Sequence, residues 1–138
     1  MSKSPIVVGV DGSDEAAAAL HWAVGQAVLQ GAPVVAVHAV GMREEHRGDP
    51  EHHGLDGDMR AWTAELEALA PELVERRAVD GSPVMVLLAV ADEVDAGLIV
   101  VGNRGIGRRT GVLLGSTSLQ VAEESGRPVV IVPTGARR

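Results

Sequence analysis

Cysteine, phenylalanine and tyrosine are absent from this sequence of 138 residues, and Trp22 and Trp62 are its two tryptophans. Without cysteine the chain has no disulfide, no catalytic thiolate, and no cysteine-ligated iron–sulfur or zinc site. With so few aromatic rings it also lacks the stacking platforms that single-stranded nucleic acids need. The lack of cysteine fits a reducing compartment, so we predict a cytoplasmic location.

Long apolar runs and an export signal are missing as well. No apolar segment approaches the ~20 residues of a membrane-spanning helix, and the amino end does not show the pattern of a signal peptide. Hydrophobic residues make up 46% of the chain, charged residues 22%, and the mean hydropathy is +0.14, which is typical of a globular protein. We therefore predict a single domain over residues 1–138 that does not enter a membrane.

Basic residues are in the minority. The chain has 12 Lys and Arg against 19 Asp and Glu, a formal net charge of −7, which disfavours attraction to nucleic acid or to an anionic membrane face. Residues 97–138, however, hold half of the basic residues and just two acidic ones, Glu123 and Glu124. Either this last third binds an anion or the asymmetry only serves solubility.

Short apolar runs alternate with amphipathic segments along the chain. Apolar strands are predicted at 6–10, 34–40, 98–101 and 129–132, with a more polar edge strand at 73–79. Helices are predicted at 14–30, 59–70, 83–95 and 116–125. Strands and helices that alternate in this way predict an α/β fold, a doubly wound (Rossmann-like) parallel sheet with helices on both faces.

The helices carry recognisable signals at their ends and on their buried sides. The predicted N-caps are Ser13 and Ser82, the latter followed by Pro83, and the predicted stops are Gly31, Ala96–Gly97 and Gly126. The buried stripe of the first helix is predicted to consist of Leu20, Ala23, Val24, Ala27 and Val28. Trp22 and Trp62 also fall on helical stripes, so we expect both in the core.

Residues 41–58 differ from the rest, because they are polar and show no periodicity. We predict a long surface loop, which in a compact domain is usually functional or mobile. Its histidines His46, His52 and His53 have acidic neighbours, but their spacing suits no defined metal site, so we expect a solvated loop and no metal centre. His38, in a strand, is expected to be a core or rim histidine with its hydrogen bonds made, not a catalyst.

Glycines, arginines and hydroxyl side chains gather between the strand at 98–101 and the last helix, over residues 102–118. Glycines let a backbone approach a ligand closely, and the first turn of a helix offers free N–H groups and a dipole that favours an anion. This arrangement predicts a phosphate site. It is neither a Walker A loop nor a G-x-G-x-x-G fingerprint, since both strings are missing.

Ligands of doubly wound sheets lie beyond the carboxyl ends of the strands, where the strand order reverses. With the first and fourth strands as the central pair, Asp11 comes to lie opposite Gly102. A carboxylate there suits ribose hydroxyls while the glycine-rich segment takes the phosphates, which predicts a mononucleotide. The alternative for Asp11 is a role as a turn or capping residue only.

The glycine spacing resembles the ATP-binding branch of the universal stress protein family. Gly102, Gly105 and Gly115–Ser116 match its pattern G-x2-G-x9-G-S/T, and Val-Asp-Gly-Ser at 10–13 matches its first turn. The resemblance covers almost the whole chain and implies a five-stranded parallel sheet in the order 3-2-1-4-5. It implies nucleotide-binding roles for Asp11, Ala39, Val101, Gly102, Gly105, Gly115, Ser116, Thr117 and Ser118. Of these, Asp11 is expected on the ribose or adenine side, and Ala39 is expected to contact adenine through its backbone. Arg104, within the glycine-rich segment, either closes over the phosphates or points to water.

The same resemblance implies a homodimer, formed through the last strand, 129–132. That strand is an uncharged edge, which invites pairing with a second copy unless the tail covers it. We predict a dimeric stress-response sensor that binds ATP, ADP or AMP, with Mg²⁺ as an optional companion and an unidentified protein partner.

We expect no catalytic residue, because no base is positioned for phosphoryl transfer. The alternatives are a slow Mg²⁺-dependent ATP hydrolase and a nucleotide-free interaction module. A flavodoxin-like electron carrier is disfavoured because its flavin usually stacks on aromatic side chains.

Overall fold

The computed structural model describes residues 3–40, 61, 63, 64, 68, 73–103 and 116–133. The strands are β1 (Ile6–Gly9), β2 (Val34–Val40), β3 (Val74–Asp80), β4 (Leu98–Gly102) and β5 (Val129–Val132). The helices with defined bounds are α1 (Asp14–Gln30), α4 (Pro83–Val94) and α5 (Ser116–Glu124). Residues 61, 63, 64 and 68 are also helical, within the predicted helix 59–70.

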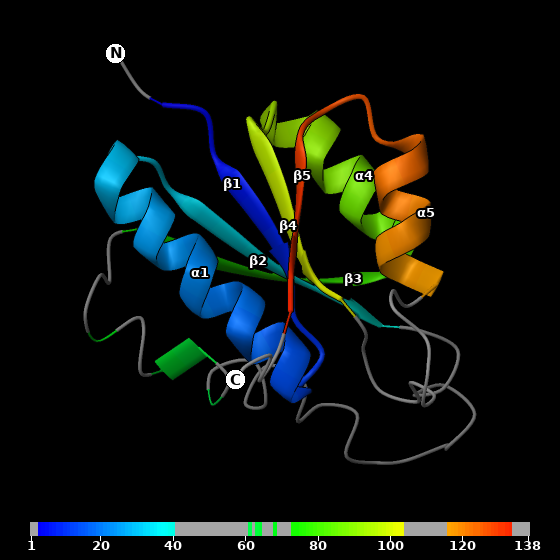
Figure 1. Ribbon diagram of the computed structural model, residues 1–138, viewed down its shortest axis with the longest axis horizontal. Helices are drawn as coiled ribbons and strands as arrows, with labels where there is room; N and C mark the ends of the chain where they lie inside the picture. Colours follow the sequence, from blue (N-terminus) through cyan, green and yellow to red (C-terminus); the bar gives the residue numbers. More distant parts are fainter. Residues whose placement is uncertain are drawn as a thin grey trace.

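All five strands form one parallel sheet in the order β3-β2-β1-β4-β5 (Figure 1). β1 is central and pairs with β2 and β4, so that Ile6 lies beside Val34 on one side and Leu98 on the other. The predicted α/β class and strand order are both confirmed. Because all strands run the same way, their carboxyl ends meet at one edge of the sheet.

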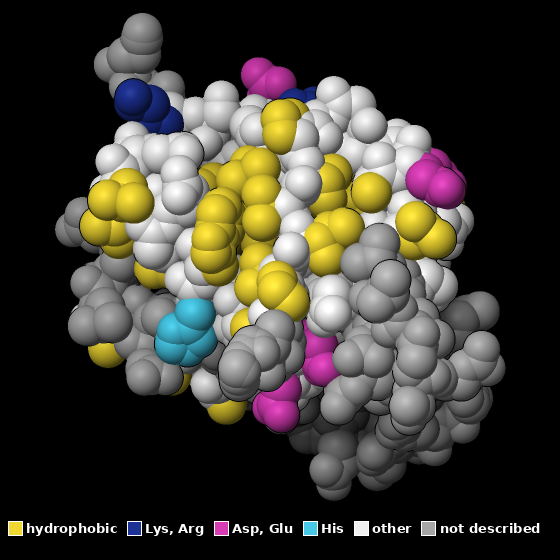
Figure 2. Space-filling model, viewed as in Figure 1, with side chains coloured by type: hydrophobic (Ala, Val, Ile, Leu, Met, Phe, Trp, Pro, Cys, Tyr) yellow, Lys and Arg dark blue, Asp and Glu magenta, His cyan; other side chains and the backbone are white. Residues whose placement is uncertain are grey.

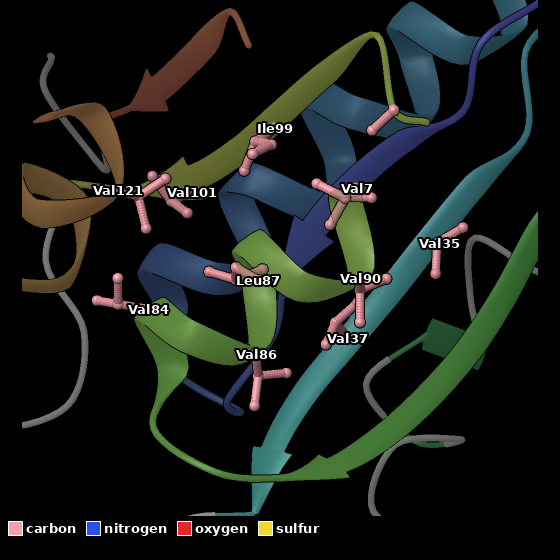
Figure 3. Close-up of a cluster of buried hydrophobic side chains, with 12 residues drawn as sticks. Val7, Val35, Val37, Val84, Val86, Leu87, Val90, Ile99, Val101 and Val121 are labelled. Carbon is pink, nitrogen blue, oxygen red and sulfur yellow. The ribbon is translucent and has the colours of Figure 1, made fainter. Parts of the chain in front are cut away.

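Each face of the sheet has its own hydrophobic core. α1 covers one face, and α4 and α5 lie together on the other (Figure 1). Along the strands, alternate side chains enter alternate cores: Val8 and Val100 face α1, whereas Val7 and Ile99 face α4. Figure 3 shows the second core, in which Val7, Val37, Ile99 and Val101 from the sheet meet Leu87 of α4 and Val121 of α5. β-Branched residues thus fill the space that aromatic rings occupy in many other domains.

The predicted helix signals are mostly confirmed. The Ser13 hydroxyl accepts a hydrogen bond from the N–H of Ala16 at 3.1 Å, and Ser82 accepts one from Met85 at 3.4 Å. Gly31 ends α1 in the left-handed conformation with φ 71°. α4 ends differently, since Asp95 rather than Gly97 takes the left-handed turn, with φ 55°. α5 ends at Glu124, and Gly126 does not adopt a positive φ.

Two core predictions on α1 are wrong. Trp22 is 38% exposed and Val28 is 57% exposed. Trp22 stands two residues from the buried Leu20 and Val24, so it faces away from them, and Val28 lies at the margin of the buried stripe near the end of the helix. The companion predictions for Trp62 and for the loop at 41–58, with His46, His52 and His53, fall outside the described residues.

The two edge strands carry different side chains. β3 reads VERRAVD and exposes Glu75, Ala78 and Asp80, and it is the polar edge strand that the sequence predicted. β5 reads VVIV, and all four of its residues are half-buried. In Figure 2, hydrophobic side chains gather over β5 and its flanks, with the charged side chains drawn in that view at the rim. Among the described residues, no helix combines the length and apolar character needed to span a membrane.

Candidate functional site at the carboxyl edge of the sheet

The candidate site lies where the central strands β1 and β4 end. From β1 the chain leaves through α1 on one face, and from β4 it continues towards α5 on the other face. This divergence is the topological switch point that the sequence predicted. Asp11 follows β1, and Gly102 and Asn103 end and follow β4, so the structure brings the two predicted halves of the site to the same edge.

Asp11 is half-buried and shapes the turn that enters α1. Its Oδ1 accepts a hydrogen bond from the N–H of Ser13 at 2.9 Å, and Ser13 in turn caps α1. Oδ2 of Asp11 makes no hydrogen bond with any described residue. The turn role considered for Asp11 is therefore real, and it occupies one carboxylate oxygen and leaves the other for a ligand.

His38 fixes the backbone that leads into Asp11. Its ring is 5% exposed, and Nδ1 lies 2.9 Å from the carbonyl oxygen of Val10. A carbonyl oxygen only accepts, so Nδ1 carries the proton in this contact. Val10 also donates its N–H to the carbonyl of Val37 at 2.9 Å. The prediction of a buried, hydrogen-bonded histidine is confirmed. The backbone bond from Val10 to Val37 extends the pairing of β1 and β2 by one residue, and His38 holds the same Val10.

The end of β4 lies directly against the first turn of α1. Gly102 contacts Glu15 so closely that a Cβ on Gly102 would lie 2.6 Å from the Glu15 carbonyl oxygen. Glu15 itself is 4% exposed, and the sequence analysis did not single it out. A signal was present, because Glu15 stands four residues before Ala19 and so continues the buried stripe of α1 towards the site.

The first turn of α5 carries three consecutive hydroxyl side chains. Ser116 is exposed and Thr117 is half-buried, so both are accessible from the edge of the sheet. Ser118 is 2% exposed, and its hydroxyl donates to the carbonyl oxygen of Asn103 at 3.0 Å. The structure therefore joins the start of α5 to the end of β4, and Ser118 faces inward rather than to the surface.

Val101 and Ala39, two further predicted residues, lie in the same region but expose little of their side chains. Val101 is buried, and its side chain belongs to the core beneath α4 and α5, so it offers at most its backbone. Ala39 lies near the end of β2, pairs with Val79 and is half-buried. The predicted residues Arg104, Gly105 and Gly115 lie outside the described part of the chain.

Comparison with known proteins gives a consistent result. The model of the universal stress protein family matches residues 4–133. A universal stress protein of Thermus aquaticus is 34% identical over 92% of this chain and 96% of its own length. Several other curated relatives are longer: a universal stress protein of Mycolicibacterium smegmatis is 31% identical over 95% of this chain, which spans 46% of that protein.

Solved structures agree with the sequence comparisons. A universal stress protein crystallised in complex with cAMP is 32% identical, with a TM-score of 0.75 over 96% of this chain and 98% of that one. A universal stress protein from Archaeoglobus fulgidus in complex with dAMP is 29% identical, with a TM-score of 0.73 over 96% and 99% of the two chains. Both ligands of these similar proteins are adenine mononucleotides.

Proposed function

This chain belongs to the universal stress protein family, and on that premise we propose that it binds an adenine nucleotide at the carboxyl edge of β1 and β4. The observation that carries the proposal is that Asp11, after β1, and the hydroxyl-bearing start of α5, bonded through Ser118 to the end of β4, lie at the same edge of the sheet. The adenine nucleotides in two similar structures support the ligand class.

Each accessible group has a part in this proposal. Oδ2 of Asp11 accepts a hydrogen bond from a ribose hydroxyl, while Oδ1 stays with Ser13. Ser116 and Thr117 donate to phosphate oxygens, where the dipole of α5 adds to the attraction. Ala39 meets the adenine through its backbone. Asp11 follows β1 and the hydroxyls lie on α5, so one nucleotide would span the two halves of the fold.

The remaining predicted residues keep the roles that the sequence assigns to them. Arg104, Gly105 and Gly115 are proposed to hold the phosphates together with the start of α5. Val101 contributes only backbone, because its side chain is in the core. We keep ATP as the proposed nucleotide, with Mg²⁺ as an optional companion.

Titration calorimetry tests this proposal. ATP, ADP, AMP and cAMP are titrated into the unchanged chain, with and without Mg²⁺, and into Asp11→Asn. Asparagine keeps an oxygen for the Ser13 N–H but loses the charge and one acceptor, so we expect the affinity for the preferred nucleotide to fall by about tenfold or more. Asp80→Asn is the matched control, since Asp80 ends β3 at the same edge of the sheet and is exposed.

The titrations have three distinguishable outcomes. Unchanged affinity in Asp80→Asn together with weakened binding in Asp11→Asn supports the site. No heat with any nucleotide, in folded protein free of carried-over ligand, contradicts the proposal and favours a nucleotide-free interaction module. Equal binding by Asp11→Asn and the unchanged chain places the nucleotide elsewhere.

We further propose that the chain is a homodimer joined through β5 and that nucleotide binding makes it a sensor in a stress response. The uncharged, half-buried edge of β5 supports this assembly. A cytoplasmic location stays a prediction, which fractionation of cells that produce the protein would test. A change of the dimer constant on addition of ATP would support the sensor role.

A further inference from the structure

Gly102 is required by packing and not by its own backbone conformation. Positive φ angles among the described glycines occur at Gly12, Gly31 and Gly81, so Gly102 has a conformation open to any residue. A Cβ at this position would lie 2.6 Å from the carbonyl oxygen of Glu15, 2.8 Å from its carbonyl carbon and 2.8 Å from its Cβ. Two of these atoms are backbone, so no side-chain rotation relieves the contact. The missing side chain lets α1 approach β4.

That approach sets the position of Asp11 relative to β4. Asp11, Ser13 and the first turn of α1 form one rigid unit, because Asp11 Oδ1 binds the Ser13 N–H and Ser13 Oγ binds the Ala16 N–H. Glu15 belongs to this unit and lies in close contact with Gly102. A methyl group at Gly102 would push the whole turn, with Asp11, away from the end of β4.

On the other face of the sheet, Ser118 positions α5 relative to β4. Its buried hydroxyl donates to the Asn103 carbonyl at 3.0 Å, and the Asn103 N–H donates to the Val132 carbonyl at 3.1 Å. Asn103 and Ser118 stand close to the two ends of the glycine-rich stretch in the sequence. The Ser118 hydroxyl therefore ties the start of α5 to β4 and through β4 to β5.

We infer that Gly102 and Ser118 are positioning residues, which order the nucleotide site before the ligand arrives. Gly102 places Asp11 by admitting α1, and Ser118 places Ser116 and Thr117 by anchoring α5. This inference rests on the proposed nucleotide site, and it gives these two residues of the motif a role in holding other ligand-binding groups in place. Preorganisation of this kind raises affinity because less ordering is left to the binding step.

Ser118→Ala tests the inference, with Ser125→Ala as its matched control. Ser125 donates its hydroxyl to the Arg127 carbonyl at 2.9 Å, the same kind of bond at the opposite edge of the sheet. We expect both variants to lose a similar amount of thermal stability. Only Ser118→Ala is expected to bind the preferred adenine nucleotide about tenfold more weakly, as measured by calorimetry.

Hydrogen–deuterium exchange without nucleotide separates positioning from direct contact. If Ser118 positions α5, its alanine variant exchanges faster than the unchanged chain in peptides that cover 98–103 and 116–121, before any ligand is added. If Ser118 were a ligand contact only, exchange in the free protein would be unchanged while binding weakened. That second pattern overturns the inference, as does unchanged affinity in Ser118→Ala.

Gly102→Ala is compared with Gly9→Ala. Gly9 ends the neighbouring strand β1, but its Cβ would meet only the flexible side chain of Leu87, at 3.4 Å. We expect Gly9→Ala to bind normally and Gly102→Ala to bind at least about tenfold more weakly, with faster exchange around residues 11–16 in the free protein. Normal binding by folded Gly102→Ala contradicts its part of the inference.

Failure of the proposed function remains distinguishable from failure of the inference. If the unchanged chain binds no adenine nucleotide, the proposed function is wrong. The exchange data on the free variants still report whether Gly102 and Ser118 order the two turns. If the unchanged chain binds but the variants behave like their controls, the function stands and the positioning roles are wrong.

Discussion

The two edge strands of the sheet differ in side-chain charge, the feature that decides whether a further strand can pair with an edge. β3 carries four charged residues, of which Glu75 and Asp80 are exposed and Arg76 and Arg77 are half-buried. β5 has only valine and isoleucine. Charged side chains discourage a second strand from docking, because docking would strip them of water. The sheet thus has one edge, β3, whose charges oppose pairing with a further strand. The other edge, β5, lies beside β4 and carries no such charges.

The edges are also anchored differently. Arg77 on β3 pairs with Glu75 at 2.7 Å and with Glu93 of α4 at 3.2 Å, and the hydrogen bond to Glu75 is the main reason that the pKa of Arg77 is raised. β5 carries no charge, and its anchor lies just before it. Both edge strands are tied to α4 by an arginine. On β3 this arginine, Arg77, is part of the strand, whereas on the other edge Arg127 precedes β5.

Arg127 is the anchor of β5. It donates to Asp92 at 3.1 Å, to Asp95 at 3.2 Å and to the Ala96 carbonyl at 2.7 Å. The hydrogen bond to Asp92, followed by that to Asp95, raises the pKa of Arg127. The strand itself is left free of charge, as an interface between copies requires.

Of the changes that test this difference between the edges, Ile131→Lys is expected to have the largest effect, and it acts on the proposed dimer. An ammonium group on β5 must be desolvated when a second copy docks, so the dissociation constant of the proposed dimer should rise by about a hundredfold or more. Sedimentation velocity measures the change. Ala78→Lys, an exposed position on β3, is the matched control and should leave the dimer intact. A wild-type chain that sediments as a monomer would contradict the proposed assembly.

Removing two of the four charges of β3 should make its edge more like that of β5. In the double variant Glu75→Thr, Arg77→Val the edge keeps its strand character but loses its protection. We expect dimers to associate further through β3, so that light scattering gives about twice the mass seen for the unchanged chain. Persistence of the original mass at every concentration would show that other features of β3 keep it single.

Arg77→Met is expected to have the smallest effect. Methionine keeps much of the apolar stem and removes the ion pairs, so the free energy of unfolding should fall by less than about 1 kcal/mol. Urea denaturation measures this difference, and it should shrink at about 1 M NaCl because salt screens half-exposed pairs. A loss that is equally large at high salt would mean that Arg77 acts mainly through packing.

The sequence was sufficient wherever a local signal decides the structure. Ser13, Gly31 and Ser82 took their predicted capping roles because a cap depends on residues within one turn. The strands of the two cores were predictable from continuous apolar runs. The sheet order came from family resemblance, since no local pattern states which strands are neighbours.

One failure was a misread helical period. Trp22 was expected in the core, but it stands two residues from both Leu20 and Val24 and so faces away from the buried stripe of α1. Packing between elements could not be read from any local pattern. The ligand roles of Gly102 and Ser118 stay predictions, and the structure adds that Gly102 lies against Glu15 and that Ser118 is buried and bonded to Asn103.

The central place of β1 affects the order in which the chain is completed during synthesis. β1 leaves the ribosome before the other strands of this sheet, and β2 soon covers one side of it, but its other partner is β4, where Ile6 pairs with Leu98. At typical translation rates that partner arrives on the order of ten seconds later. Until then the most buried strand of the finished protein is an open apolar edge, and closing so long a loop is entropically slow. The middle of the sheet is begun first and closed late.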